Sequence, residues 1–478
     1  MLRRTKIVAT LGPATDDPKM MDKLIAAGVD VVRINLSHGS YETHAARAER
    51  VRNRARACGR QVGVLVDLQG PKIRIGRFRE GSVALKQGST FVLDADCPLD
   101  TGDPSRVGVT YGNLPGDLQR GDTVLLNDGQ IELWVDSVEG SKIACQVVHG
   151  GRLSDSKGLN KKGGGLSAPA LTDKDREDIR FAAEIEADYL AVSFVRSGED
   201  VEQARELLRA AGGAGGIVAK VERAEAVDAV EEIINASDVV MVARGDLGVE
   251  IGDAELPAVQ KRLISTARSL NKVVITATQM MESMIDNPIP TRAEVFDVAN
   301  AVLDGTDAVM LSGETAVGRY PDKVVEAMAR VCVEAEKQSK ARRSDHRLHS
   351  MFGRTDEAIA MATMYTANHL GVKAIAALTE SGSTPKWMSR ISSGIPIYAL
   401  TPHVATRRKV TLYRGVYPVS FHYEEGQDSQ QANVEIVEEL RRRGAIRDGD
   451  LVVITKGDLE GVSGGTNVMK IVTVGEND

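Results

Sequence analysis

Short apolar runs rich in β-branched residues alternate along the chain with longer stretches in which apolar residues recur every three to four positions. The first pattern is typical of buried strands and the second of amphipathic helices. The runs predict strands near residues 5–9, 29–34, 62–67, 188–193, 216–220, 238–243, 272–276 and 307–311. Helical connections require successive strands to be parallel with right-handed crossovers. Eight such units predict a closed (β/α)8 TIM barrel, with an open doubly wound sheet as the structural alternative.

Two segments depart from this pattern. Residues 69–164 alternate apolar and polar positions in short stretches separated by Gly-rich turns, which predicts a small inserted β domain. After a charged connector, helix and strand patterns resume, with strands expected near 373–378, 396–400, 415–420 and 450–455. We therefore expect an α/β protein with a barrel built from residues 1–68 and 165–345, an inserted β domain at 69–164 and an open α/β domain at 346–478.

Composition narrows the class of protein. The chain has 478 residues, of which 42% are hydrophobic and 27% charged, as in ordinary soluble proteins of several domains. Its net charge of −7 provides no basic field to attract nucleic acid or an anionic membrane surface. The four cysteines form no CxxC pair, and the first apolar run is too short for a signal sequence or a membrane span. We expect a cytoplasmic protein with a small-molecule partner.

The active site of a barrel is expected at the carboxyl ends of its strands. Here those ends are polar: they carry Arg33, Asn35, Ser37, Asp67, Lys220, Glu222, Arg244, Asp246, Thr276, Thr278, Ser312 and Glu314. A salt bridge at one strand end would explain Lys220 and Glu222 taken alone. It does not explain polar groups at six strand ends, so we expect these side chains to form a site.

The residue types at these ends indicate the chemistry. Glu222 and Asp246 supply hard carboxylate oxygens, which hold Mg²⁺ while leaving room for substrate oxygens. The basic residues Arg33, Arg74, Lys220 and Arg244 outnumber these two acids, which favours an anionic substrate. The segment "ARGDLG" offers backbone N–H groups to a carboxylate where a short helix begins, although a plain tight turn explains it equally well. Together these features predict a small phosphorylated carboxylate bound to a metal.

Several long stretches resemble the motifs of the pyruvate kinase family, in the family's order. They are "TKIVATLGPAT", "VVRINLSHGS", "DLQGPKIR", "SDSKGLN", "IVAKVE", "MVARGDLGVE", "TATQMMESM" and "MLSGETAVGRYP". The resemblance covers essentially the whole chain. It implies a barrel with an inserted small β-barrel lid domain and a C-terminal regulatory domain, usually assembled as a homotetramer. It also implies the glycolytic reaction of phosphoenolpyruvate with ADP to give pyruvate and ATP, with Mg²⁺ or Mn²⁺ as cofactor.

The resemblance implies roles for individual residues. Glu222 and Asp246 would hold the metal, Lys220 would face the transferring phosphoryl group and the enolate, and Arg33 would hold phosphoryl oxygens. The backbone of Gly245 and Asp246 with the Thr278 hydroxyl would fix the substrate carboxylate. The nucleotide would be bound by Asn35, His38, Arg74 and the lid residue Lys157. The water that protonates the enolate would be held by Thr278, with Ser312 and Glu314 behind it.

Two positions remain open at this stage. Asp128 matches an acid near the family's site, yet "NDG" is also a strong hairpin signal, and the two interpretations have equal weight. Many pyruvate kinases have a glutamate directly after the Gly-Pro and bind K⁺ at positions matching Asn35, Ser37, Asp67 and the carbonyl of Leu68. This chain has Lys72, whose ammonium can take the electrostatic role of K⁺, so we expect activity without K⁺.

The segment "TESGSTPKWMSR" predicts a helix capped by Thr384 with Pro385 at its first position, so that the hydroxyls of Ser381, Ser383 and Thr384 face one spot. A capped helix alone would account for it. In pyruvate kinases the similar loop, here with Thr379 and Gly382, holds a phosphate of an allosteric effector. The late segment "GDLEGVSGGTNVMK" is acidic and Gly-rich, which predicts a loop. We expect the allosteric effector to be either a sugar monophosphate or a nucleoside monophosphate.

Two other functions account for part of the same pattern. A metal-dependent lyase or aldolase acting on pyruvate enolate would use a similar barrel mouth, but it leaves the inserted domain and Lys157 without a role. A metabolite sensor without catalysis would be favoured only if Lys220 or a metal-binding acid were missing, and both are present.

Overall fold

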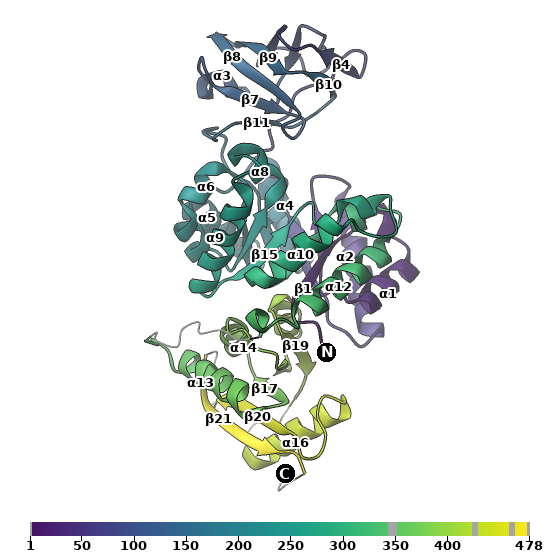
Figure 1. Cartoon of the computed structure of the whole chain (residues 1–478), viewed down its shortest axis with the longest axis vertical. Coiled ribbons are helices and arrows are strands. Elements are labelled where there is room, and N and C mark those ends of the chain that lie inside the picture. The colour runs from purple at the N-terminus through teal and green to yellow at the C-terminus, as the bar shows by residue number, and fades with distance from the viewer. Residues whose placement is uncertain (1, 343–350, 423–428, 458–463, 476–478) are drawn as a thin grey trace.

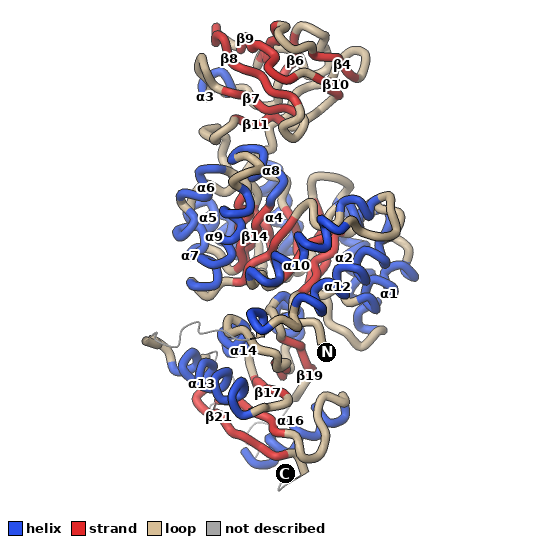
Figure 2. Tube along the Cα trace, viewed as in Figure 1, coloured by secondary structure: helices blue, strands red, loops and turns tan. Residues whose placement is uncertain are grey.

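The computed structural model describes residues 2–342, 351–422, 429–457 and 464–475. The chain forms three parts arranged along one long axis, with the barrel in the middle, the inserted β domain at one end and the C-terminal α/β domain at the other (Figure 1). Coloured by secondary structure, the inserted domain is almost entirely strand, whereas helices surround the barrel (Figure 2). The expected border between residues 345 and 346 lies outside the described residues.

Parallel strands close into the barrel in the order β1-β16-β15-β14-β13-β12-β3-β2. They are β1 (Lys6–Thr10), β2 (Val31–Asn35), β3 (Gly63–Asp67), β12 (Tyr189–Val192), β13 (Gly216–Val221), β14 (Val239–Ala243), β15 (Val273–Ala277) and β16 (Ala308–Leu311). All eight predicted strands are present, and closure rules out the open-sheet alternative. Successive residues serve two cores: Ile7 and Val32 pack beneath the surrounding helices, whereas Val8 and Val31 fill the barrel.

Helices follow the strands and cover the barrel. They are α1 (Pro18–Ala27), α2 (Tyr41–Ala57), α4 (Asp173–Glu184), α5 (Gly198–Ala210), α6 (Ala224–Asp228), α7 (Val230–Ala236), α8 (Arg244–Ile251), α9 (Leu256–Ser269), α10 (Arg292–Asp304), α11 (Gly313–Ala316) and α12 (Pro321–Ala335). Thr172 and Thr291 begin α4 and α10 with capping boxes, in which side chains satisfy the free N–H groups of the first turn. Within the described residues no helix is both long and apolar enough to cross a membrane.

The inserted domain leaves the barrel directly after β3. It contains β4 (Ser82–Leu85), β5 (Thr90–Asp94), β6 (Arg106–Gly108), α3 (Leu114–Asp117), β7 (Thr123–Leu126), β8 (Ile131–Glu139), β9 (Lys142–His149), β10 (Gly151–Ser154) and β11 (Leu159–Lys161). A six-stranded sheet, β11-β7-β8-β9-β5-β6, lies with the pair β10-β4 around a separate core that includes Phe91 and Leu133. Asn127 and Asp128 adopt φ of 52° and 55° between β7 and β8, so the hairpin interpretation describes this turn.

The C-terminal domain is an open sheet in the order β19-β18-β17-β20-β21. Its elements are α13 (Thr355–Leu370), β17 (Ala374–Leu378), α14 (Ser383–Ser389), β18 (Ile397–Thr401), α15 (Val404–Lys409), β19 (Val416–Ser420), α16 (Ser429–Arg442), β20 (Leu451–Gly457) and β21 (Thr466–Thr473). The four predicted strands are present and parallel. The loop predicted over the late Gly-rich segment is wrong from Thr466 onward, because β21 pairs there with β20 in the antiparallel direction; residues 458–463 lie outside the described part.

Candidate active site

The polar strand ends meet at the end of the barrel beside the inserted domain, since that domain begins directly after β3 (Figure 1). A chain of ion pairs crosses this mouth. Arg33 Nε lies 2.6 Å from Asp67 Oδ2, the second Asp67 oxygen lies 3.3 Å from Lys220 Nζ, and Lys220 Nζ lies 2.9 Å from Glu222 Oε1. Asp67, Lys220 and Glu222 are 0%, 8% and 3% exposed, so these charges are held away from bulk water.

Burial and neighbouring charges set the protonation states of the side chains in this row of ion pairs. Burial alone would raise the pKa of Asp67, but Lys220 and Arg33 outweigh it and hold that pKa below its ordinary value. Burial would lower the pKa of Lys220, but Asp67 and Glu222 raise it above its usual range. Burial raises the pKa of Glu222, and the nearby carboxylate Asp246 adds to that effect. The lysine is therefore held as a cation, and two acids near each other favour a positive charge between them.

The second half of the mouth is built on α8, which starts directly after β14. Lys72 Nζ donates to Asp246 Oδ1 at 2.9 Å, and the Gly245 N–H donates to Thr278 Oγ1 at 2.8 Å. Thr278 has φ of +67°, a left-handed conformation that is strained for a β-branched residue. The structure thus brings Gly245, Asp246 and Thr278 together, as expected for one small binding site.

The carboxylates at the mouth suit a metal ion that keeps several coordination positions open for water and substrate. Within the described residues there is no group of three or more His, Cys, Asp or Glu side chains placed to hold a metal ion. Glu222 and Asp246 instead form a pair, close enough for each charge to influence the other. Mg²⁺ is commonly held by one or two carboxylates together with waters and substrate oxygens. The residues present therefore fit Mg²⁺ or Mn²⁺ and do not form a closed cage.

Three basic residues of the inserted domain lie on segments that contact one another. The Arg74 guanidinium donates to the Ser156 carbonyl at 3.0 Å, and the next carbonyl, that of Lys157, accepts from the backbone of Ile75 at 2.9 Å. A Cβ on Gly158 would lie 3.4 Å from Cε of Lys72. Lys72, Arg74 and Lys157 therefore lie on adjoining segments.

The loop after β2 carries the other predicted nucleotide and cation positions. The Ser37 N–H donates to Asn35 Oδ1 at 3.2 Å, and the exposed residue His38 accepts a hydrogen bond at its carbonyl from the His44 ring, 2.7 Å away. Asn35 pairs in register with Asp67 on the neighbouring strand, and the Leu68 carbonyl accepts from the Ser193 hydroxyl at 2.9 Å. This group lies on the barrel, whereas Arg74 and Lys157 belong to the inserted domain.

Ser312 and Glu314 follow β16. Glu314 accepts from the Ser312 N–H at 2.6 Å and from the Met281 N–H at 3.3 Å, so its carboxylate links the end of β16 to the loop that contains Thr278. Burial raises the pKa of Glu314 above its ordinary value. This arrangement places a buried acid behind the Thr278 loop.

Two predicted members of the polar cluster do not belong to it. Arg244 is 7% exposed and turns away from the mouth: it donates to the Thr278 carbonyl at 2.6 Å and to Asp297 at 2.7 Å. Thr276 is fully buried, and its hydroxyl donates to Thr306 at 3.0 Å. The prediction that Arg244 adds to the cationic substrate site is wrong, because this guanidinium supports the strained Thr278 loop.

Sequence reasoning missed two hydroxyls of the site. Ser193 lies directly after β12 and accepts a hydrogen bond from Lys220 Nζ at 2.7 Å, while Thr10 at the end of β1 accepts from Arg33 at 3.2 Å. Ser193 ends a predicted barrel strand and Thr10 directly follows one, and that position was the available signal. Each hydroxyl fixes the direction of one cationic side chain.

The predicted effector loop is only partly brought together. Helix α14 begins at Ser383 with Gly382 as its N-cap, at φ of +81°, so the prediction that Thr384 is the cap is wrong. Thr384 is buried, and its hydroxyl lies 2.6 Å from that of Thr466 on the unpredicted strand β21. Thr379 Oγ1 accepts from the Gly382 N–H at 2.9 Å. A cavity of about 260 Å³ is lined by Ser381, Gly382 and Ser383 together with Arg354, Lys386, Lys409, Tyr189, Asp238, Val239 and Tyr413.

Comparisons with known proteins agree with this architecture over the whole chain. The sequence model for "Pyruvate kinase, barrel domain" matches residues 2–325, and that for "Pyruvate kinase, alpha/beta domain" matches residues 357–472. The chain is 58% identical over 477 residues to pyruvate kinase II of Salmonella typhimurium, covering 99% of both chains. It is 55% identical over 460 residues to the pyruvate kinase of Haemophilus influenzae, covering 95% of this chain and 96% of that one. The chain belongs to the pyruvate kinase family.

Proposed function

We propose that this chain transfers the phosphoryl group of phosphoenolpyruvate to ADP in glycolysis, giving pyruvate and ATP, with Mg²⁺ or Mn²⁺ as cofactor. The observation that carries this function is the pair of acids Glu222 and Asp246 beside the cation Lys220 at the barrel mouth. Full-length relatives named pyruvate kinases support it. The lyase or aldolase alternative is not favoured, because it gives the basic residues of the inserted domain no role.

The proposed roles follow from position and charge. Arg33 and Lys220 bind the phosphoryl oxygens, and Lys220 also stabilises the negative charge of the departing enolate. The N–H groups at the start of α8, with the Thr278 hydroxyl, orient the substrate carboxylate. A divalent cation held by Glu222 and Asp246 would neutralise substrate oxygens during transfer.

The inserted domain acts in this proposal as a lid over the nucleotide. Arg74 and Lys157 bind the ADP phosphates, with Asn35 and His38 on the barrel side, and closure excludes water from the transfer step. The proposed domain limits are 1–68 and 165–345 for the barrel, 69–164 for the lid and 346–478 for the C-terminal domain. Apolar clusters confined to the barrel helices, to the lid and to the C-terminal domain support these limits, and one further cluster is shared by the barrel interior and the C-terminal domain. The enolate proton would come through water near Thr278 and Ser312, with Glu314 fixing the two loops.

A direct assay tests the reaction. Pyruvate formation coupled to lactate dehydrogenase is expected to require ADP, phosphoenolpyruvate and Mg²⁺ together. Turnover in the absence of ADP would contradict phosphoryl transfer and would favour chemistry on the enolate alone.

We expect full activity without K⁺, because Lys72 supplies a fixed positive charge at the mouth, where its ammonium contacts Asp246. In the K⁺-binding members, the positions matching Asn35, Ser37, Asp67 and Leu68 hold a diffusible cation instead. Rates measured in tetramethylammonium salts should equal those in potassium salts at the same ionic strength. The Lys72→Glu chain should lose at least about tenfold in kcat without K⁺ and regain part of it when K⁺ is added. A strong K⁺ requirement in the unsubstituted chain would overturn the proposal.

The cavity beside α14 supports the proposed effector site, because Ser381 and Ser383 line it together with three cationic residues. A phosphorylated sugar or a nucleoside monophosphate should lower the phosphoenolpyruvate concentration required for half-maximal rate. The Ser383→Ala chain should need about 10- to 100-fold more effector, since a hydrogen bond to a charged group is lost. Ser420→Ala, an exposed change on β19, is the matched control. An effector response that is identical in Ser383→Ala would exclude this cavity.

We also propose a cytoplasmic homotetramer. Helix α10 and the loop before it expose large apolar side chains: Ile289 is 72% exposed and Phe296 is 71% exposed. Exposed apolar groups of this size on one segment support a contact between subunits.

A further inference from the structure

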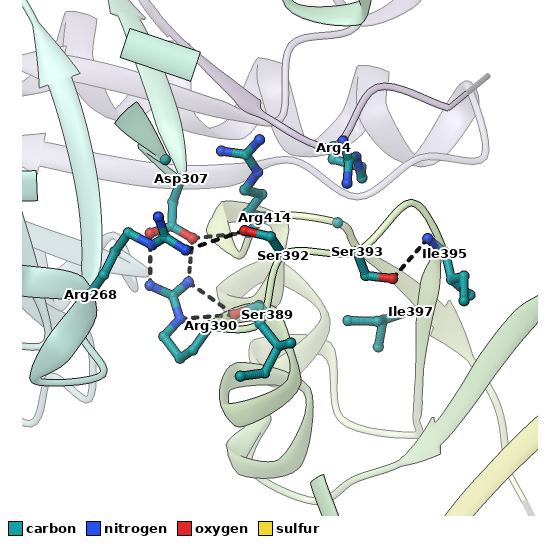
Figure 3. Close-up of a pocket in the computed structure, with 13 residues that line it drawn as sticks. Arg4, Arg268, Asp307, Ser389, Arg390, Ser392, Ser393, Ile395, Ile397 and Arg414 are labelled. Carbon is teal, nitrogen blue, oxygen red and sulfur yellow. Dashed lines mark hydrogen bonds and ion pairs between the residues drawn. The ribbon is translucent and has the colours of Figure 1, made fainter. Parts of the chain in front are cut away.

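A small cavity lies where the amino-terminal end of the barrel meets the C-terminal domain, at the opposite end of the barrel from the active site. Arg268 reaches it from α9, Asp307 from the position directly before β16, and Arg4 from the residues before β1. Arg390 and Arg414 come from the C-terminal domain. Figure 3 shows the side chains of Arg268, Arg390 and Arg414 gathered around Asp307.

Positive charge exceeds negative charge on the wall of this cavity. Of the described residues that line it, Asp307 alone is acidic, and its oxygens already accept from the Arg390 guanidinium and from the Val274 N–H. Arg4 is balanced by Glu336 behind it, 3.7 Å away. Among the described residues, neither Arg268 nor Arg414 forms an ion pair: Arg268 donates to the Ser392 hydroxyl at 3.2 Å, and Arg414 donates to two backbone carbonyls.

This excess charge is partly removed from water. Burial, together with Arg414 and Arg390, lowers the pKa of Arg268. Burial and the nearby Arg414 lower the pKa of Arg4 to about 10. Guanidinium groups that repel one another in a partly desolvated space are stabilised by an anion that is itself removed from water. The cavity therefore has the electrostatics of an anion site.

The shape of the cavity limits the anion. It leaves about 20 Å³ of space for the centres of water-sized atoms, which the oxygens of one phosphate group fill and a sugar or nucleoside exceeds. Guanidinium forks match the geometry of phosphate oxygens. The Ser392 hydroxyl accepts from Arg268 and keeps its own proton to donate. Gly305 adopts φ of +98°, a conformation that favours glycine, and the absence of a Cβ there leaves room for the Arg268 guanidinium.

We propose that this cavity binds one tetrahedral oxyanion, inorganic phosphate under cellular conditions, between Arg268, Arg414 and the Ser392 hydroxyl. Because Arg268 belongs to the barrel and the other two residues to the C-terminal domain, the bound anion joins the two parts. The site is separate from the cavity beside α14, and it does not depend on the effector proposed for that cavity.

Calorimetric titration of the full chain with inorganic phosphate tests this site. Saturating Mg²⁺ and phosphoenolpyruvate without ADP keep the barrel mouth filled, and a constant ionic strength removes general salt effects. We expect one phosphate per chain at this site, with affinity reduced about 10- to 100-fold in Arg268→Gln. Arg262→Gln, on the exposed side of the same helix, and Ser383→Ala should both bind phosphate as the unsubstituted chain does.

A second variant, Ser392→Ala, and competition by other anions test the phosphate site independently of Arg268→Gln. Ser392→Ala removes only a hydroxyl, so a measurable loss of phosphate affinity is expected even if Arg268→Gln folds poorly. Sulfate should compete with phosphate, whereas chloride should not, and ribose 5-phosphate should not because of its size. Absence of phosphate binding under these conditions, equal affinity in Arg268→Gln and Ser392→Ala, or displacement by ribose 5-phosphate would each overturn the proposal.

Discussion

Replacing Lys220 by Met should lower kcat by about 10²- to 10³-fold, because the ammonium that lies between Asp67 and Glu222 is then lost and cannot meet the developing negative charge. The ammonium is fixed by these two carboxylates and by the Ser193 hydroxyl. Its position is therefore set before the substrate binds, which is the condition under which electrostatic stabilisation is most effective. The lactate-dehydrogenase-coupled rate at saturating substrates measures the loss.

The same substitution leaves two buried carboxylates without their cation, so part of any loss could reflect unfolding. Thermal unfolding of Lys220→Met measures that part directly. Lys323→Met, on the exposed face of α12 where Lys323 pairs with Glu326 at 3.0 Å, is the control for loss of a lysine at the surface. Turnover of folded Lys220→Met within about tenfold of the unsubstituted chain would remove Lys220 from its proposed role.

Replacing Glu222 by Gln should weaken divalent-metal binding by at least about tenfold and lower kcat by about 10²-fold, since one of the two charged oxygen ligands is lost. The amide keeps the size of the side chain, and its oxygen can still accept from the Phe194 N–H, which lies 2.9 Å from Glu222. The fold is therefore expected to survive. Electron paramagnetic resonance of Mn²⁺ in the absence of substrates measures the metal affinity of the site independently of turnover.

Glu326→Gln supplies the matched control, because it removes one exposed carboxylate of the surface pair with Lys323. It should leave both Mn²⁺ affinity and kcat unchanged. If Glu222→Gln binds Mn²⁺ as tightly as the unsubstituted chain, Glu222 does not hold the metal. Chelation of divalent metal should abolish turnover in every variant.

Periodicity identified the barrel because each strand is buried on both sides and each helix on one, and these patterns are local. It failed at β21, where glycines and charged residues precede a strand at the edge of the sheet. The capping prediction was wrong at Thr384. Local capping rules favoured Thr384 as the cap, but the long-range contact with Thr466 uses its hydroxyl inside the domain.

The sequence by itself determined the eight barrel strands, the four parallel strands of the C-terminal domain, most of the polar residues at the barrel strand ends, and the family that the motifs resemble. Only the tertiary structure decided which of those residues share a site. Strand position places both Asp246 and Arg244 beside the mouth, yet Arg244 turns inward to hold the Thr278 loop while Asp246 meets Lys72. The cavity that contains Arg268 and Arg414 was likewise decided by the tertiary structure. The burial and the charge balance of these two arginines depend on neighbours that are distant in sequence and that come together only when the chain packs.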